Sequence, residues 1–174
     1  MNVKPDKAVL LDAASKKSDR TRFTILTAAA KQFRTSGYRS STVRRIADAA
    51  GVEAGSIYYH FSSKEEIFDA VLDKGLRQLY HAVREAGETC EADGCGFRET
   101  FVRMLHYHLT YLLKENDFTS ANIRNFSMLP QHMRERHRPL RMAYAELWEE
   151  LLRKALREGQ IRSDIKVAPL RHFL

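Results

Sequence analysis

The sequence predicts an all-α protein in which a small N-terminal helical domain is joined by a linker helix to a larger helical bundle. Apolar residues recur at intervals of three and four residues over most of the chain, as the buried face of an amphipathic helix requires. No segment shows the alternation of apolar and polar residues that a half-buried strand would need. Gly37, Gly51 and Gly159 each follow a periodic segment, where a helix commonly ends.

The first periodic segment follows a polar stretch. Residues 1–18 contain Pro5 and show no strong helical period, so we expect a flexible N-terminal arm. A first domain is expected over residues 19–66 and a second over residues 67–174. The first helix should run from Asp19 to near Gly37, with an inner face formed by Ile25, Leu26, Ala29, Ala30 and Phe33.

The most informative stretch is residues 41–64, STVRRIADAAGVEAGSIYYHFSSK, which predicts a helix, a tight turn, a second helix and the start of a third. Val43 to Ala50 should form the first of these helices, because apolar residues recur there at helical spacing. The hydroxyl of Thr42 can accept a hydrogen bond from an unpaired amide of its first turn. Gly51 can end the helix in the left-handed conformation at no steric cost.

The second helix is expected from about Ala54 to Phe61. Ile57 and Phe61 lie four residues apart and should point toward the preceding helix together with Val52. The outward face is then small at its start and polar beyond it, and it consists of Gly55, Ser56, Tyr59 and His60, with Tyr58 at its margin.

This arrangement suits a helix-turn-helix, whose second helix enters the DNA major groove with its first turn on the base edges. Small residues from Ala54 to Ser56 would let the backbone come close to the bases. The N-terminal arm would then be either a plain disordered tail or a segment that reaches the minor groove. The alternative to DNA binding is a helical hairpin in an ordinary bundle, with Tyr58 and Tyr59 as half-buried packing.

The distribution of charge is a second, independent indication. Residues 1–64 hold 12 lysines and arginines against 5 aspartates and glutamates, whereas residues 65–174 hold 17 of each. The formal net charge of +7 therefore falls on the part that contains the predicted helix-turn-helix. Electrostatic capture of a polyanion requires such an asymmetry.

Several short motifs resemble the DNA-binding domain of the tetracycline-repressor (TetR) family. They are Leu26-x-x-Ala-Ala-x-x-Phe33, Gly37-Tyr38, Thr42-Val43-Arg44-x-Ile46-Ala47, Ala50-Gly51-Val52 and Gly55-Ser56-Ile57-Tyr58-Tyr59-His60-Phe61-x-Ser63-Lys64-Glu65-Glu66. The resemblance covers roughly residues 20–72 and implies a homodimeric transcription regulator. Such a regulator is normally a repressor that a small ligand releases from a palindromic operator in double-stranded DNA.

The resemblance also implies which residues bind DNA. Matched position by position, the residues expected to hold phosphates are Thr42, Tyr58, His60 and Lys64. Those expected at the base edges are Arg44, Ala54, Gly55, Ser56 and Tyr59.

The linker helix should begin after Ser62 and Ser63, because Ser62-x-x-Glu65 and Ser63-x-x-Glu66 both fit a capping box. It should run from Ile67 to about Ala86 and connect the two domains mechanically. Residues 87–96, GETCEADGCG, are predicted as a loop because they are rich in glycine and lack periodicity.

The remaining helices are expected from about Phe97 to Lys114, from Phe118 to Met128, and from beyond Pro139 to about Glu158. Pro130 and Pro139 are expected to interrupt the pattern. In the last helix the expected buried stripe consists of Leu140, Tyr144, Leu147, Trp148, Leu151 and Ala155. In the second of the three, Ile123 and Phe126 should face inward.

Composition narrows the class of protein. With 44% apolar and 29% charged residues, and without a long apolar run, we expect a cytoplasmic protein that does not enter a membrane. The two cysteines, Cys90 and Cys95, suit a reducing compartment. Their spacing relative to His106 and His108 does not fit a standard zinc motif. No catalytic constellation is visible, so we expect neither an enzyme nor a cofactor.

An effector pocket would lie among the helices after the linker. The inward candidates are Phe101, Leu105, His108, Leu109, Phe126, Tyr144 and Trp148, which could equally be plain core. Arg134 and Arg138 belong to a basic cluster that is either a solvated face or a clamp for an acidic ligand, such as a carboxylate or a coenzyme A thioester. Bound effector would move the linker helix and change the separation of the two recognition helices.

Two further alternatives follow from the sequence. The chain could bind DNA without ligand control, or recruit another protein on the same fold. Members of the family usually continue for several tens of residues beyond the point where this sequence stops, and Val167 to Leu174 resemble the entry to a helix that is cut short. The expectation is therefore either a C-terminal bundle that is truncated at its end, with weaker dimerisation, or a member of the family that dimerises differently.

Overall fold

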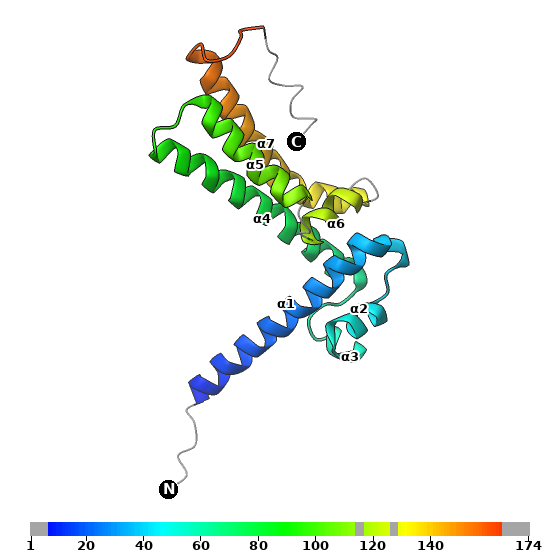
Figure 1. Ribbon diagram of the computed structural model, residues 1–174. Coiled ribbons are helices and arrows are strands. Elements are labelled where there is room, and N and C mark those ends of the chain that lie inside the picture. Colours follow the sequence, from blue (N-terminus) through cyan, green and yellow to red (C-terminus); the bar gives the residue numbers. More distant parts are fainter. Residues whose placement is uncertain (1–6, 114–116, 126–128, 165–174) are drawn as a thin grey trace. The chain divides into compact units, whose positions relative to one another are not determined.

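The computed structural model describes residues 7–113, 117–125 and 129–164, and all of the regular structure in these ranges is helical. The elements are α1 (Lys7–Ser40), α2 (Val43–Ala50), α3 (Ala54–Ile57), α4 (Lys64–Ala92), α5 (Phe97–Leu113), α6 (Asp117–Asn125) and α7 (Gln131–Arg157) (Figure 1). The chain divides into two compact units, Met1–Val71 and Leu72–Leu174, and α4 contributes to both. The predicted all-α fold is confirmed.

Helix α1 begins at Lys7, earlier than the predicted Asp19, so residues 7–18 belong to the helix rather than to an arm. The physical reason is composition: alanine, leucine and lysine dominate this stretch, and it holds no glycine or proline after Pro5. At the other end Gly37 leaves helical geometry with φ 76° and ψ 165°, which confirms the predicted stop. The Ser41 hydroxyl donates to the Gly37 carbonyl at 2.8 Å and supports this turn.

The first unit has one core to which all four of its helices contribute. Phe33 of α1 meets Phe68 of α4 edge to face at 4.9 Å between ring centroids, and Tyr38 stacks on Phe68 at 4.5 Å. The other buried side chains are aliphatic or small, apart from one more phenylalanine: Ile25, Leu26, Ala29, Ala30, Ile46, Ala47, Ile57, Phe61, Ile67 and Val71. The predicted inner face of α1 is thus confirmed, and so are Ile57 and Phe61.

The N-terminus of α4 carries a capping arrangement close to the predicted one. The Ser63 hydroxyl accepts the Glu66 amide hydrogen at 3.1 Å. The Glu66 carboxylate reaches back to both the amide and the hydroxyl of Ser62, each at 2.6 Å. These hydrogen bonds to the charged form lower the pKa of Glu66.

Replacing Glu66 by glutamine should lower stability in a pH-dependent way. Because the folded pKa is lowered from 4.5, the carboxylate contributes fully above about pH 5, and the contribution is lost as pH falls through the folded pKa. The side chain is exposed, so we expect a loss of only about 0.5 kcal/mol near neutral pH. Thermal unfolding between about pH 3 and 7 should show the difference from wild type shrinking on the acid side. Glu85→Gln on the same helix is the control, and a pH-independent difference for Glu66→Gln would contradict the assignment.

Helix α4 continues to Ala92, past its predicted end near Ala86, so the predicted loop over residues 87–96 is wrong for residues 87–92. The reason is tertiary packing. A Cβ atom on Gly87 would lie 3.2 Å from the Met104 sulfur, and on Gly75 it would lie 2.5 Å from the Phe118 carbonyl oxygen. Both glycines therefore allow another helix to approach closely. A periodicity argument cannot detect such a contact and treats each glycine only as an unfavourable residue for a helix.

Helix α7 runs unbroken from Gln131 to Arg157 with Pro139 inside it, so the predicted interruption at Pro139 is also wrong. A proline removes one amide donor and crowds the carbonyl four residues earlier. Here Pro139 and Glu135 are both exposed, so water can serve the carbonyl that lacks a partner. Pro130 precedes the helix, where its lack of an amide hydrogen costs nothing.

The second unit is centred on packing between α4, α5 and α7, which lie side by side in Figure 1. Its buried cluster consists of Leu79, Val83, Ala86, Met104, Tyr144 and Trp148, and Phe101, Leu105, Leu147 and Leu151 pack against it partly buried. Within the described ranges no helix combines the length and the apolar character needed to cross a bilayer.

Candidate nucleic-acid interface

Helix α2 is fixed at both ends by local hydrogen bonds. Thr42 has extended backbone angles, and its hydroxyl accepts the Arg45 amide hydrogen at 3.2 Å, as predicted. At the other end Gly51 adopts the left-handed conformation, and the Val52 amide donates to the Ala47 carbonyl at 3.1 Å. This tight end sets the direction in which the chain enters α3.

Helix α3 is shorter than the predicted Ala54 to Phe61, because it spans only Ala54–Ile57. Beyond it the amides of Tyr58, Tyr59 and His60 each donate to the carbonyl three residues earlier, so the chain tightens into a turn. The Phe61 amide returns to Ile57 at 2.9 Å, which places both apolar side chains in the core. The segment thus keeps a helical course while its last turn is narrower than an α-helix.

The outward face of this segment is the one that the sequence predicted. Tyr59 is 90% exposed and Tyr58 is 59% exposed, which speaks against the alternative in which they are packing residues. Ser56 and His60 are partly exposed. The other predicted base and phosphate contacts on α2 and α3 are exposed: Thr42, Arg44, Ala54 and Gly55.

Gly55 is informative because nothing within the protein requires a glycine there. A Cβ atom at this position would meet no heavy atom within 4 Å, and the backbone φ is not positive. At Gly75 and Gly87 a neighbouring helix leaves little room for a side chain, whereas the space in front of Gly55 is open. Any need for a glycine at this position must therefore come from a binding partner.

Lys64 has a role that its place in a motif did not reveal. Its ammonium group donates to the carbonyls of Tyr38 and Ser41, both at 3.0 Å, and lies 4.2 Å from the centroid of the Tyr38 ring. Burial, with the Glu65 charge as a smaller cause, raises the pKa of Tyr38. Lys64 therefore joins the start of α4 to the connection between α1 and α2. Periodicity could not have shown a contact between residues 26 positions apart.

The inward candidates of the second unit fall into separate places. His108, Tyr144 and Trp148 are buried together, and the His108 Nδ1 atom lies 2.5 Å from the Tyr144 hydroxyl oxygen. Burial lowers the pKa of His108 and raises that of Tyr144, and in both cases it favours the neutral form. The Trp148 indole N–H is buried and approaches the Tyr144 hydroxyl oxygen, but in geometry too poor for a regular hydrogen bond.

Other candidates lie elsewhere. Leu109 was predicted to face inward, but it is 42% exposed, because the buried line on α5 passes through Met104 and His108 and leaves the next residue outside. Arg134 and Arg138 are exposed on α7. Phe126 lies outside the described residues, as do Val167 to Leu174 and the side chain of Ile123.

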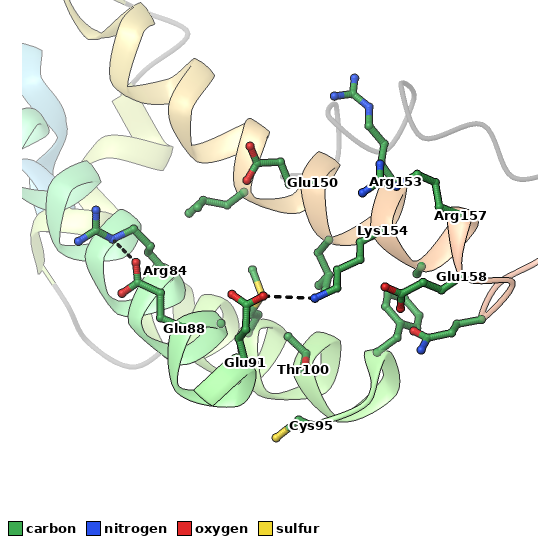
Figure 2. A pocket seen from close by; sticks show the side chains of 17 residues that line it. Arg84, Glu88, Glu91, Cys95, Thr100, Glu150, Arg153, Lys154, Arg157 and Glu158 are labelled. Atoms are coloured by element: carbon green, nitrogen blue, oxygen red, sulfur yellow. Dashed lines mark hydrogen bonds and ion pairs between the residues drawn. The ribbon is translucent and has the colours of Figure 1, made fainter. Parts of the chain in front are cut away.

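A pocket of about 920 Å³ opens between α4, α5 and α7 in the second unit. It contains none of the predicted pocket residues. Met104, Leu147 and Leu151 form its apolar wall, and charged side chains line its rim. Figure 2 shows the Lys154 ammonium crossing the space to the Glu91 carboxylate at 3.2 Å, and Arg84 paired with Glu88 at 3.4 Å. Periodicity could not predict this pocket, because the polar residues at its rim cannot be distinguished in sequence from ordinary solvent-exposed residues.

Comparison with known proteins gives the family. Residues 25–71 match the family model described as "Bacterial regulatory proteins, tetR family", and residues 95–173 match "Tetracyclin repressor-like, C-terminal domain". The chain is 33% identical over 168 residues to the HTH-type transcriptional repressor KstR2 of Rhodococcus jostii, covering 94% of this chain and 78% of that protein. It is 41% identical over 71 residues to the HTH-type transcriptional activator FasR of Mycolicibacterium smegmatis, covering 41% of this chain and 32% of that protein.

The solved structures agree. The TetR-family transcriptional regulator PfmR of Thermus thermophilus superposes with a TM-score of 0.73 at 28% identity, covering 85% of this chain and 78% of that one. The matches take in both helical units, and the outward face of α2 and α3 has the geometry of a helix-turn-helix. The chain therefore belongs to the TetR family of bacterial transcriptional regulators.

Proposed function

We propose that the outward face of residues 42–64 binds the operator of a transcriptional repressor. The observation that carries this proposal is the open space in front of Gly55, which lies between exposed side chains on a segment whose Ile46, Ile57 and Phe61 are buried. A backbone that can approach a surface this closely suits insertion into a major groove. The charge of residues 1–64 supplies the attraction to DNA that does not depend on base sequence.

The residues divide by the kind of contact that they would make. Thr42, Tyr58, His60 and Lys64 are proposed to hold phosphates, because hydroxyl, imidazole and ammonium groups donate readily to them. The base edges would be met by Arg44, Ala54, Gly55, Ser56 and Tyr59. An arginine can bond guanine with two donors, and a serine can bond several bases.

Replacing Lys64 by alanine should have two separable effects. An ammonium group has three N–H donors, and two of them are used by the carbonyls of Tyr38 and Ser41, which leaves one for a phosphate. Loss of these hydrogen bonds should lower the free energy of unfolding by about 1–3 kcal/mol. Loss of the phosphate contact should lower DNA affinity for all sequences and reduce the slope of log affinity against log salt by about one.

Urea unfolding and a salt titration of DNA affinity measure the two effects. Lys154→Ala is the matched control, because it removes the same charge from the pocket of the second unit. A Lys64→Ala protein that loses stability but keeps the wild-type slope would show that Lys64 only positions the domain.

The repressor is proposed to act as a homodimer in the cytoplasm. Two copies would place two recognition segments on half-sites of a palindrome about one helical turn or a small multiple apart. KstR2, a relative that is similar over most of the chain, is named a repressor, which favours repression over activation for this protein. FasR, named an activator, is similar over a shorter stretch.

We infer that a small effector binds within the second unit and releases the operator. Among the described residues the buried Trp148 indole N–H has only a poorly placed acceptor, the Tyr144 hydroxyl, which also pairs with His108. A buried donor whose hydrogen bond has poor geometry is costly, so a well-placed oxygen acceptor on a ligand would be stabilised there. An acidic compound or a coenzyme A thioester supplies such oxygens, and the exposed Arg134 and Arg138 could hold its charged end.

Calorimetry tests this part of the proposal. Carboxylic acids and their coenzyme A thioesters are titrated into the protein with and without bound operator. Release requires that the effector bind the DNA-free protein more tightly, and operator must then weaken effector binding by the same factor. Trp148→Phe keeps an aromatic ring and removes the donor, so it should weaken binding about tenfold. Identical affinity in the two titrations would exclude a compound as the inducer, and the absence of any binding would favour regulation without a ligand.

A further inference from the structure

The turn that ends α4 brings the two cysteines of the chain together. Gly94 adopts φ 71°, its amide donates to the Glu91 carbonyl at 3.2 Å, and the Cys95 amide donates to the Cys90 carbonyl at 2.9 Å. These two bonds define a Schellman motif, in which the third-last helical residue contacts the second residue beyond the helix cap. In this chain both of those positions are cysteines.

The backbone geometry suits a disulfide. A hydrogen bond of 2.9 Å between the Cys95 nitrogen and the Cys90 oxygen keeps the two Cα atoms within about 7 Å, given standard bond lengths. Disulfides need Cα atoms no farther apart than about 7 Å. The thiols also interact: partial burial, and next a hydrogen bond with the Cys90 thiol, raise the pKa of Cys95 to about 11.

The two thiols differ in access. Cys90 is fully buried, whereas Cys95 is partly exposed and belongs to the lining of the pocket between α4, α5 and α7. Figure 2 shows the Cys95 side chain at the edge of that pocket. An oxidant in solution would therefore reach Cys95 first, and Cys90 would act as the resolving thiol.

We propose that Cys90 and Cys95 form a reversible intramolecular disulfide, which makes the end of α4 a thiol-exchange site for low-molecular-weight disulfides. The Cys95 thiolate attacks one sulfur of the small disulfide, forms a mixed disulfide, and releases one thiolate. The Cys90 thiolate then attacks the Cys95 sulfur and expels the second. The protein loses two electrons and two protons, and the small disulfide is reduced to two thiols.

Arg103 gives this site a nearby positive charge. It bonds Asp93, which lies between the two cysteines in the sequence, at 3.4 Å and Glu99 at 3.1 Å. The largest cause that raises the pKa of Arg103 is the charge that Cys90 carries as a thiolate. A thiolate formed during the exchange thus has a counter-charge within reach.

The experiment uses the full chain, reduced and then equilibrated without oxygen in mixtures of oxidised and reduced glutathione. Free thiols are trapped with N-ethylmaleimide in denaturant, so that the buried Cys90 also reacts, and the intact mass is measured. We expect a monomeric product that carries neither maleimide nor glutathione and is lighter than the reduced protein by two hydrogens. The fraction of this product should rise in a single transition as the proportion of oxidised glutathione increases. Because the attacking thiol is protonated at neutral pH, the initial rate should rise about tenfold per pH unit between about pH 7 and 9.

Variants separate this proposal from simple surface oxidation. Cys90→Ser should stop at a stable glutathione adduct on Cys95, and Cys95→Ser should gain no adduct while folded. Arg103→Gln should slow the exchange several-fold. The proposal is overturned if wild type keeps two trapped thiols at every glutathione ratio, ends as a glutathione adduct, or forms only disulfide-linked dimers.

Discussion

Replacing Gly55 by leucine should lower affinity for the operator by a factor of about 100 or more while leaving the fold intact. The position has no heavy atom within 4 Å of an added Cβ, so the folded protein accommodates a side chain there. A major groove that closely contacts the recognition segment would have no room for the leucine side chain. Gly55→Ala should weaken binding about tenfold, and its stability should be unchanged or slightly higher, since alanine favours a helix over glycine.

The measurement is fluorescence anisotropy with operator and with random DNA, alongside thermal unfolding. Gly96→Leu is the matched control, because Gly96 also has open space and an ordinary φ but lies in the second unit. The loss for Gly55→Leu should be larger on operator than on random DNA. An unchanged ratio would mean that the face of α3 does not meet the bases.

Replacing Trp148 by alanine should have the largest effect on stability. Its ring is 2% exposed and packs against Phe101 at 5.8 Å and His108 at 5.9 Å between centroids. Removing a buried ring of this size should cost about 3–5 kcal/mol, by lost transfer energy and by the cavity left behind. Trp148→Phe should cost less, because it keeps most of the contacts.

Urea unfolding followed by circular dichroism measures the loss. Trp148 is the only tryptophan, so its fluorescence in the wild type reports the second unit alone and assigns the transition. Glu150→Ala, on the exposed side of the same helix, should change stability by less than about 0.5 kcal/mol. A Trp148→Ala loss below about 1 kcal/mol would show that the ring does not form the core of this unit.

Much of the first unit could be predicted because its rules are local. The cap at Thr42, the left-handed stop at Gly51 and the inward Ile57 and Phe61 each depend on neighbours within a few residues. The same local rules failed where distant contacts decide. Lys64 bonds carbonyls of Tyr38 and Ser41, a contact that no spacing in the sequence indicates.

In the second unit the errors have three different causes: tertiary packing, solvent exposure and helical phase. Gly87 suggested a loop, but it is a helical residue at a position where the Met104 side chain leaves little room for a Cβ atom. Pro139 suggested a break, but it lies where solvent can serve the carbonyl that it leaves unpaired. The inward prediction for Leu109 failed by a single residue of helical phase, which periodicity cannot resolve on a helix that is apolar on more than one side.

The central claim is that residues 42–64 read a specific DNA sequence, and selection from a pool of randomised duplex DNA tests it most directly. Wild type and Gly55→Leu are carried through the same rounds at fixed salt, and the retained DNA is sequenced. We expect wild type to enrich a palindrome with two half-sites, and Gly55→Leu to enrich no such sequence. Enrichment of the same palindrome by both proteins, or of no sequence by wild type, would contradict this assignment.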